Sequence, residues 1–381
     1  MKFWKRAILI NLAVILAVVA ALAIFFATPA GSPALKTALL VPEVVPNFPV
    51  KPLRFLSREP KIEEITLKVA GKEIKADLYR LQDNKRHPAI IFTLGTIVTR
   101  KNPTVTKISQ ALARSGFVVL VPDLPDFLSG FVWIDSVNTL ISSVEFLDEQ
   151  GFVDDQKIGF AGFCVGASAS IIAAENEKIS DKVAFISAIS PYFDLRQTTE
   201  AVTIKQALDE NELLEPWEPA KLSIETVQKG FINYVSNEQE RQLLKEFFLE
   251  NKEISEEKIA NFSTQTKAIY NLLTNVDWQK RDEVWSNLSP DLRDFLNQLS
   301  PSTNIANLKA KLFVLNDKKD TFVPRIEGVK LAKSLPKEQI FFVEVDSFEH
   351  VNPKTKLPRL VIMRQLWQLG GFIYRVLYYS G

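Results

Sequence analysis

Short, continuous apolar runs recur along the chain after residue 60. Runs of this length are typical of strands buried on both faces of a parallel sheet. They cover residues 89–92, 117–121, 158–161, 183–186, 311–315 and 340–345. Helical patterns separate most of them, at residues 105–115, 134–150, 167–175 and 325–335. This alternation predicts an α/β fold, with a mostly parallel sheet flanked by helices and right-handed crossovers.

Two stretches depart from that alternation. Residues 65–69 and 74–79 alternate in polarity around a turn at 70–72, which predicts an antiparallel hairpin. Residues 190–311 show no clear strand, but helix-start signals occur at Ser236-Asn237-Glu238-Gln239 and at Ser289-Pro290. We therefore expect a core of residues 61–195 and 302–381, interrupted at residues 196–301 by four or five helices that form a cap.

The cap has two interpretations from sequence alone. It is either a solvated helical cover with an apolar underside or a lid that selects apolar acyl chains. Five aromatic residues are candidates to line it: Phe231, Phe247, Phe248, Trp278 and Trp285.

Residues 7–27 form a long apolar segment in which Asn11 is the only polar residue. As a helix this segment reaches roughly 31 Å, enough to cross a bilayer core. A basic cluster at residues 2–6 precedes it, which predicts a cytoplasmic N-terminus with the rest of the chain on the other side. We interpret residues 1–30 as a single-pass membrane anchor; a signal peptide cleaved near residues 28–30 is the alternative. Residues 31–60 hold six prolines and are interpreted as a linker.

Residues 354–381 have the pattern of a C-terminal helix with apolar side chains on most faces. Its aromatic and arginine side chains resemble an interfacial segment, and packing on the sheet is the alternative. These side chains are Trp367, Tyr374, Tyr378, Tyr379, Arg364 and Arg375.

The composition narrows the chemistry. The 381 residues carry 46 basic and 45 acidic side chains, a net charge of +1, which argues against a nucleic-acid partner. One cysteine excludes an intramolecular disulfide and a Cys-rich zinc site, and two histidines leave little for a His-based metal site. We expect no metal and no cofactor. Chemistry that needs a thiol or an imidazole has three places to occur: Cys164, His87 and His350.

Cys164 lies in Gly162-Phe163-Cys164-Val165-Gly166, between a predicted buried strand and a predicted helix. This is the G-x-nucleophile-x-G pattern of a nucleophile elbow, with sulfur in place of oxygen. The turn is so tight that side chains at Gly162 and Gly166 would clash. The sulfur would stand at the N-terminal end of a helix, where the helix dipole favours the thiolate. The alternative is a small buried apolar residue, which describes most free cysteines.

An acid and a base should follow the nucleophile in that order. Asp320 lies in a D-x-x-V-P turn after one buried strand, and His350 follows the last strand. We predict that His350 deprotonates Cys164 and later protonates the leaving group, while Asp320 holds the imidazole tautomer. Asp317 and Asp194 are alternatives for the acid. His87 begins a strand at the opposite edge and is interpreted as a turn or surface histidine.

Backbone N–H groups should stabilise the oxyanion of an acyl-transfer reaction. The residue after the nucleophile supplies one, the N–H of Val165. The loop after the strand at residues 89–92 should supply the other, from Thr96 or Ile97, since Gly95 lets the backbone fold over the thiol.

These residues resemble the α/β-hydrolase superfamily and, within it, the dienelactone hydrolase group, which uses Cys in G-x-C-x-G. The resemblance runs from about residue 62 to residue 379 without the insertion, and includes Val121-Pro122-Asp123-Leu124, the Cys164 elbow, the Asp320 turn and the His350 loop. It implies a Cys-His-Asp hydrolase that acts on a small-molecule ester or lactone and needs no cofactor. With the predicted anchor, the catalytic domain would be extracytoplasmic. The sequence departs from that group at residues 93–96, where a characteristic glutamate is missing, and in its insertion and predicted anchor.

Two other functions stay open at this point. Polyhydroxyalkanoate synthases are similar in their Cys elbow, Asp and His, and transfer acyl groups from coenzyme A. Here Asp123 is followed by Leu124 and Pro125 rather than by their tryptophan. A non-catalytic binding protein that kept the fold is the second alternative, because fold alone does not imply function.

Overall fold

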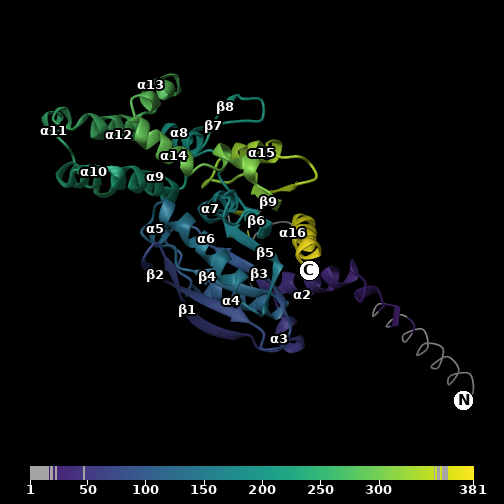
Figure 1. The fold of residues 1–381 in the computed structure, drawn as a ribbon. Coiled ribbons are helices and arrows are strands. Elements are labelled where there is room, and N and C mark those ends of the chain that lie inside the picture. The colour runs from purple at the N-terminus through teal and green to yellow at the C-terminus, as the bar shows by residue number, and fades with distance from the viewer. Residues whose placement is uncertain are drawn as a thin grey trace, which may run out of the picture.

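The computed structural model describes residues 17, 20–21, 24–45, 48–346, 348–349, 352–353 and 359–381. An eight-stranded sheet lies in the body of the molecule, with helices on both faces (Figure 1). Its strands are β1 (Lys61–Val69), β2 (Lys72–Arg80), β3 (His87–Thr93), β4 (Val118–Pro122), β5 (Val153–Phe163), β6 (Val183–Ile189), β9 (Lys311–Asp317) and β10 (Ile340–Val345).

The strand order is β1-β2-β4-β3-β5-β6-β9-β10. β1 and β2 are antiparallel, with Ile65 opposite Ala76, which confirms the predicted hairpin. β2 is also antiparallel to β4, and every later neighbour is parallel. The predicted mostly parallel sheet is therefore confirmed. Because β3, β5, β6, β9 and β10 run in one direction, the loops that follow them gather at one edge.

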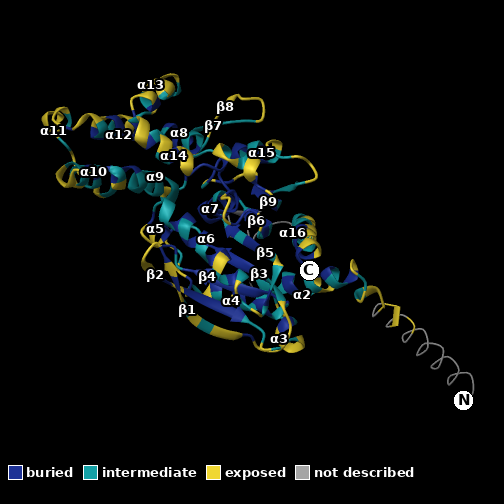
Figure 2. Ribbon diagram, in the orientation of Figure 1, coloured by how far each residue is buried: buried dark blue, intermediate teal, exposed yellow. Residues whose placement is uncertain are grey.

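The helices of the core divide between the two faces of the sheet. They are α4 (Pro103–Arg114), α5 (Pro125–Leu128), α6 (Ile134–Asp148), α7 (Val165–Ala174), α15 (Arg325–Lys333) and α16 (Arg359–Ser380). One apolar cluster joins the sheet to α6 and α7, through residues such as Leu140 and Ile171. A second cluster on the other face includes Ala111 of α4 and Phe372 of α16. The parallel strands at the centre of the sheet, such as β3, β4 and β9, are largely buried between these layers (Figure 2), which is why their sequences lack the polar alternation of β1 and β2.

The chain between β6 and β9 forms a helical insertion that extends away from the sheet (Figure 1). Its helices are α8 (Leu195–Ile204), α9 (Lys221–Tyr234), α10 (Glu238–Glu250), α11 (Glu256–Ala260), α12 (Thr264–Thr274), α13 (Arg281–Ser286) and α14 (Pro290–Gln298), with three 3₁₀ turns η1 (Trp278–Lys280), η2 (Pro301–Thr303) and η3 (Ile305–Asn307). It has its own apolar cluster, which includes Phe231, Ile269 and Leu292.

The helix-start signals in the insertion are only partly confirmed. Ser289 caps α14 as predicted, with its Oγ accepting from the Leu292 N–H at 3.3 Å. α10 is capped by Asn237 rather than by Ser236, because the Asn237 carboxamide oxygen accepts from the N–H groups of both Gln239 and Glu240.

The prediction that residues 190–311 lack strands is wrong. β7 (Gln206–Leu208) and β8 (Leu214–Pro216) form a short antiparallel hairpin. Asp209 sets its turn by accepting from the N–H groups of Asn211 and Leu213. Three-residue strands carry no readable alternation, so the pattern could not reveal them.

The N-terminal part also differs from its predicted form. Residues 31–44, interpreted as part of a linker, form α2 (Gly31–Val44), and α3 (Leu53–Leu56) follows. α2 lies against α16 and α4 and buries Leu40, so tertiary packing overrides the proline content. Within the described ranges, no helix is both long and apolar enough to cross a membrane. The predicted span at residues 7–27 lies mostly outside those ranges and stays a prediction.

Candidate active site

Cys164 lies at the turn between β5 and α7, at the edge where the parallel strands end. Its backbone has φ +54° and ψ −131°, a conformation that L-residues rarely adopt. The carbonyl of Ile189 in β6 accepts from the Cys164 N–H at 2.8 Å, which fixes the turn against the neighbouring strand. The half-buried Cys164 side chain faces a cavity. The predicted order of strand, cysteine and helix is confirmed.

The flanking glycines are required by close backbone packing, as predicted. A Cβ on Gly162 would lie 2.6 Å from the Cα of Ala167, and one on Gly166 would lie 2.4 Å from the carbonyl oxygen of Leu94. Real Cβ atoms do not approach other atoms this closely. A Cβ on Gly95 would lie 3.8 Å from the Cβ of Cys164, so the loop after β3 passes directly over the cysteine.

Two of the three predicted oxyanion donors remain available. Val165 is the first residue of α7, and its N–H makes no hydrogen bond within the described residues. The same holds for the Thr96 N–H in the part of the loop that the structure describes. The N–H of Ile97 instead donates to the Phe127 carbonyl at 2.7 Å, because Ile97 adopts a positive φ that turns it away. Ile97 is therefore a wrong prediction, and Val165 and Thr96 stay candidates.

Asp320 lies in the loop between β9 and α15 and is 3% exposed. Its Oδ1 accepts from the N–H groups of Phe322, at 2.7 Å, and Val323, at 3.2 Å, so the carboxylate organises its own loop. Phe322 and Val323 line the same cavity as Cys164. Of the alternatives, Asp194 caps α8 through the Gln197 N–H, and Asp317 accepts from the Lys319 N–H.

The helical insertion is fixed to the Asp320 loop at three consecutive carbonyls. The carbonyls of residues 320–322 accept, in order, from the indole N–H of Trp217 at 2.8 Å, the backbone N–H of Ala220 at 2.7 Å and the hydroxyl of Ser223 at 3.0 Å. On the next turn of α9, the hydroxyls of Thr226 and Thr96 lie 3.3 Å apart. The start of α9 therefore bridges the loop that carries Asp320 and the loop that covers Cys164. We call these four contacts the α9 bridge.

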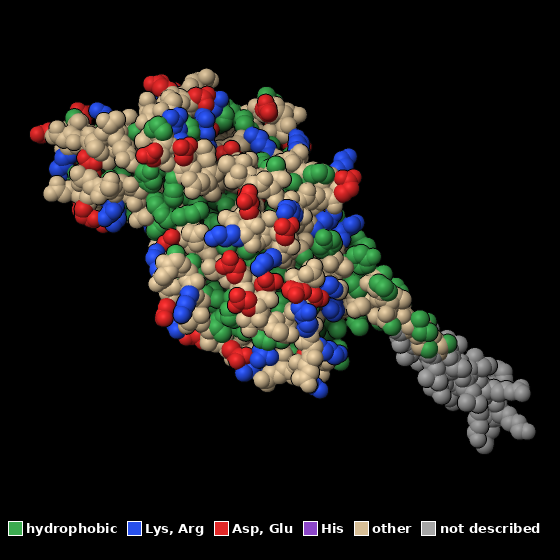
Figure 3. Space-filling view, in the orientation of Figure 1, with side chains coloured by type: hydrophobic (Ala, Val, Ile, Leu, Met, Phe, Trp, Pro, Cys, Tyr) green, Lys and Arg blue, Asp and Glu red, His purple; other side chains and the backbone are tan. Residues whose placement is uncertain are grey.

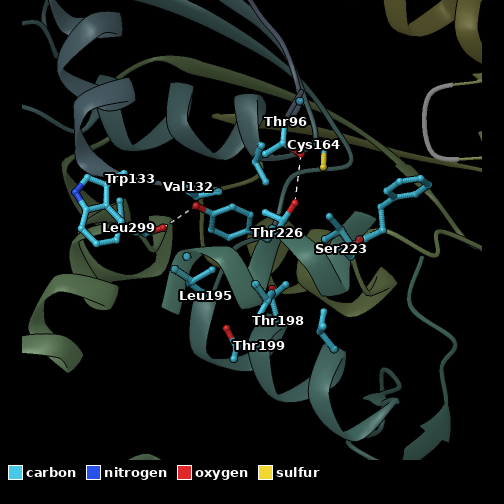
Figure 4. Close-up of a pocket in the computed structure, with 18 of the residues that line it drawn as sticks. Thr96, Val132, Trp133, Cys164, Leu195, Thr198, Thr199, Ser223, Thr226 and Leu299 are labelled. Atoms are coloured by element: carbon cyan, nitrogen blue, oxygen red, sulfur yellow. Dashed lines mark hydrogen bonds between the residues drawn. The ribbon is translucent and has the colours of Figure 1, made fainter. Parts of the chain in front are cut away.

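The cavity beside Cys164 lies between the insertion and the core and has a volume of about 290 Å³. In Figure 4, Cys164 and Thr96 lie at one end and Thr198 and Thr199 of α8 at the other. Aromatic side chains form much of the wall: Trp133, Phe163, Tyr192, Phe231, Tyr234, Phe295 and Phe322.

Only Phe231 of the five aromatic residues predicted to line the cap lies in this wall. Trp285 is buried in the apolar cluster of the insertion, and Phe247 packs against Phe248 and Tyr270. The cavity takes aromatic side chains from the core as well, which periodicity within the insertion could not indicate.

His350 lies outside the described residues. It falls in sequence between β11 (Phe348–Glu349) and β12 (Asn352–Pro353), an antiparallel pair, and follows β10. Val345 at the end of β10 pairs with Asp317 at the end of β9, so the chain leaves β10 at the edge that carries Cys164 and Asp320. His87 lies at the start of β3, at the other edge, with its ring nitrogens 3.1 Å from the Gly116 carbonyl and 2.7 Å from the Asp83 carboxylate.

Glu327 of α15 is fully buried behind the site and was not singled out by its sequence context. Its Oε2 accepts from the N–H groups of Phe193 and Asp194 at 2.9 and 2.7 Å. Burial raises the pKa of Glu327 to about 7, against the effect of these two donors. Trp217, Ser223 and Thr226 were missed as well, since a contact across about 100 residues leaves no local signal.

No protein-family model and no curated protein matches the sequence. Solved structures do share the fold. The acylaminoacyl peptidase of Pyrococcus horikoshii aligns with 84% of this chain at 14% identity and a TM-score of 0.50. The aligned part is 42% of the peptidase chain, so this chain spans less than half of it. An esterase of Pyrobaculum calidifontis aligns over 92% of this chain and 90% of its own, at 16% identity and a TM-score of 0.47. The likeness to the peptidase, with the strand order described above, shows the α/β-hydrolase fold.

Proposed function

We propose that this protein is a hydrolase that cleaves an ester, lactone or thioester through a Cys164–His350–Asp320 triad. One observation carries the proposal: the only cysteine of the chain occupies the strained turn between β5 and α7, beside an apolar cavity and N–H groups to which no described residue bonds. A buried apolar cysteine would need none of these features. The use of sulfur here follows the pattern of the dienelactone hydrolase group.

The proposed reaction proceeds in two steps. His350 takes the thiol proton, and Cys164 Sγ attacks the substrate carbonyl carbon while the N–H groups of Val165 and Thr96 stabilise the oxyanion. The carbonyl re-forms as the bond to the alcohol or thiol breaks, His350 donates its proton to that leaving group, and a thioester on Cys164 remains. Water, deprotonated by His350, then attacks the thioester, releases the acid and regenerates the thiol. Asp320 orients the imidazole throughout.

The cavity favours an apolar acyl group. Its volume of about 290 Å³ is about twice the ~150 Å³ of an apolar cavity that holds benzene, so a chain of roughly ten to twelve carbons fits. The hydroxyls of the lining threonines are few, and Thr96 and Thr226 already face each other. We therefore propose medium-length apolar acyl esters or lactones as substrates.

Activity-based labelling tests this function. An iodoacetamide probe should label the wild type, the label should be lost on Cys164→Ala and weakened on His350→Ala, and p-nitrophenyl esters should be hydrolysed by the same thiol. An unreactive thiol at neutral pH would instead indicate a non-catalytic binding protein. A labelled thiol that turns over no ester in water, but does so with an added alcohol acceptor, would indicate an acyltransferase.

We further propose that residues 7–27 anchor the protein in a membrane, with the N-terminus cytoplasmic and the catalytic domain extracytoplasmic. The apolar length of this segment and the basic residues before it support the proposal. Protease protection in sealed vesicles of both orientations tests it: the domain should be digested only when the extracytoplasmic side faces the protease. A soluble, shortened mature chain would instead show that a signal peptide had been removed.

A further inference from the structure

The outer face of α16 exposes large apolar side chains in a single stripe. Trp367 is 83% exposed, Met363 66% and Tyr378 56%, and Tyr379 beside them is 48% exposed. Met363, Trp367, Gly371, Arg375 and Tyr378 follow one another at three or four positions, so one side of the helix carries three large apolar side chains with a glycine and an arginine between them. The opposite side, with Phe372, Val376 and Leu377, is buried against the core. We call the exposed stripe the α16 outer face.

The charge of this face has one sign. Arg364 and Arg375 are exposed on α16, and the Arg375 guanidinium lies 4.3 Å from the ring centre of Phe341. Residues 350–381 contain five basic and no acidic side chains, and residues 1–42 contain four basic and no acidic ones. The rest of the chain then holds 37 basic and 45 acidic residues, so the protein as a whole is neutral but these two segments are not.

α2 and α16, the described helices of these two segments, lie side by side and carry Lys36, Arg364 and Arg375. The chain leads into α2 past the exposed Ile24 and Phe25. Figure 3 shows charges of both signs across the body of the molecule and hydrophobic side chains along the segment that enters α2. The helices of the insertion lie toward the other end of the molecule from that segment (Figure 1).

We propose that the α16 outer face rests in the headgroup region of a lipid bilayer that contains anionic phospholipids. Tryptophan and tyrosine favour the boundary between headgroups and acyl chains, where an apolar ring and a polar group are both satisfied. The exposed positive charges of Arg364 and Arg375 favour anionic headgroups over neutral ones. A second copy of this chain fits less well, because a two-fold contact through this face would bring the arginines of both copies together. The side chains of α16 support this proposal whether or not residues 7–27 cross the bilayer.

Tryptophan quenching by brominated lipids tests the proposal on the full chain. The wild type and Trp367→Phe are reconstituted into vesicles of phosphatidylcholine with phosphatidylserine, with bromine at a shallow acyl position. The difference between the two emission spectra is the emission of Trp367, which should be blue-shifted and quenched by the bromine. Trp278→Phe, in the insertion, is the matched control. The emission of Trp278, obtained from the corresponding difference spectrum, should be unquenched. Trp367 is largely exposed, so its replacement should leave the fold intact.

Charge dependence and oligomeric state complete the test. Replacing Arg364 and Arg375 by glutamine should reduce the quenching of Trp367, and high salt or pure phosphatidylcholine should do the same in the wild type. Unquenched, water-like emission from Trp367 in anionic vesicles would overturn the proposal. So would light scattering that shows a dimer in detergent that Trp367→Ala converts to a monomer, since a second copy would then cover this face.

Discussion

The α9 bridge predicts that Trp217 positions Asp320, the proposed catalytic acid, without touching the substrate. Its indole N–H donates to the Asp320 carbonyl at 2.8 Å, yet Trp217 does not line the cavity. Trp217→Phe removes this donor and keeps an aromatic ring. The hydrogen bonds of the Asp320 carboxylate to Phe322 and Val323 remain, so the loop should keep its internal turn while losing part of its anchorage.

The size of the effect follows from the hydrogen bonds removed. One neutral hydrogen bond contributes about 1 kcal/mol, which is about fivefold in rate if it is lost only in the transition state. Ser223→Ala removes the bond to the Phe322 carbonyl, and the double variant should therefore lose about 2 kcal/mol, or about thirtyfold. Because Ser223 also lines the cavity, its single replacement should change KM as well, whereas Trp217→Phe should not.

Steady-state kinetics on a p-nitrophenyl ester measure this split. We expect kcat of Trp217→Phe to fall about fivefold with KM unchanged, and Trp278→Phe to match the wild type in both. Thermal unfolding serves as the control for folding. If kcat of Trp217→Phe equals that of the wild type, or if Trp278→Phe loses as much, the insertion does not position the acid loop and this reasoning is refuted.

Three further predictions concern the nucleophile, the cavity and a buried acid. Cys164→Ala should abolish both probe labelling and ester turnover, and residual turnover above about 1% would place the chemistry elsewhere. Gly230→Leu on α9 should raise KM for decanoyl esters but not for acetyl esters, since a Cβ there meets nothing closer than Phe131 at 4.0 Å and the larger side chain extends into the cavity; an equal effect on both esters would contradict the proposed acyl site. Glu327 should make the folded protein less stable as the pH rises from about 4.5 to 7. The folded state holds the Glu327 proton up to a pKa of about 7, whereas the unfolded chain releases it at about 4.5. The free energy of unfolding should therefore fall by about 3 kcal/mol over this range, and the fall is complete above pH 7. Thermal unfolding of Glu327→Gln should show a weaker pH dependence than the wild type, with Glu253→Gln on the exposed surface as control; equal slopes would show that Glu327 is ionised in the folded state.

The sheet and the turn that carries Cys164 were predictable because their signals are local. Strands buried on both faces must be apolar throughout. All residues of β4 are buried, and its continuous apolar run therefore identifies it as a strand from the sequence. The elbow requires glycine on either side of Cys164 because the backbones of Leu94 and Ala167 come too close for a side chain. Both constraints act within a few residues, and a single sequence records them.

The contacts that complete the site were not predictable. Trp217 and Asp320 are 103 residues apart, and their hydrogen bond depends on how the insertion folds back onto the sheet edge. Ile97 looked as suitable as Thr96 until its positive φ and its bond to Phe127 were seen. α2 was not predicted because its prolines argue against a helix. Its packing against α16 and α4 favours the helix, and this packing is not visible in the sequence.

The backbone at Cys164 has a consequence for how this enzyme can change. Holding a side chain at φ +54° and ψ −131° costs of the order of 1–3 kcal/mol, which glycine at this position would largely recover. The position at which glycine would relieve this strain is therefore the one that carries the proposed nucleophilic sulfur. Selection for heat tolerance alone would favour glycine at position 164 and so remove the sulfur. Efforts to stabilise the protein should therefore leave the elbow unchanged and target surfaces remote from it.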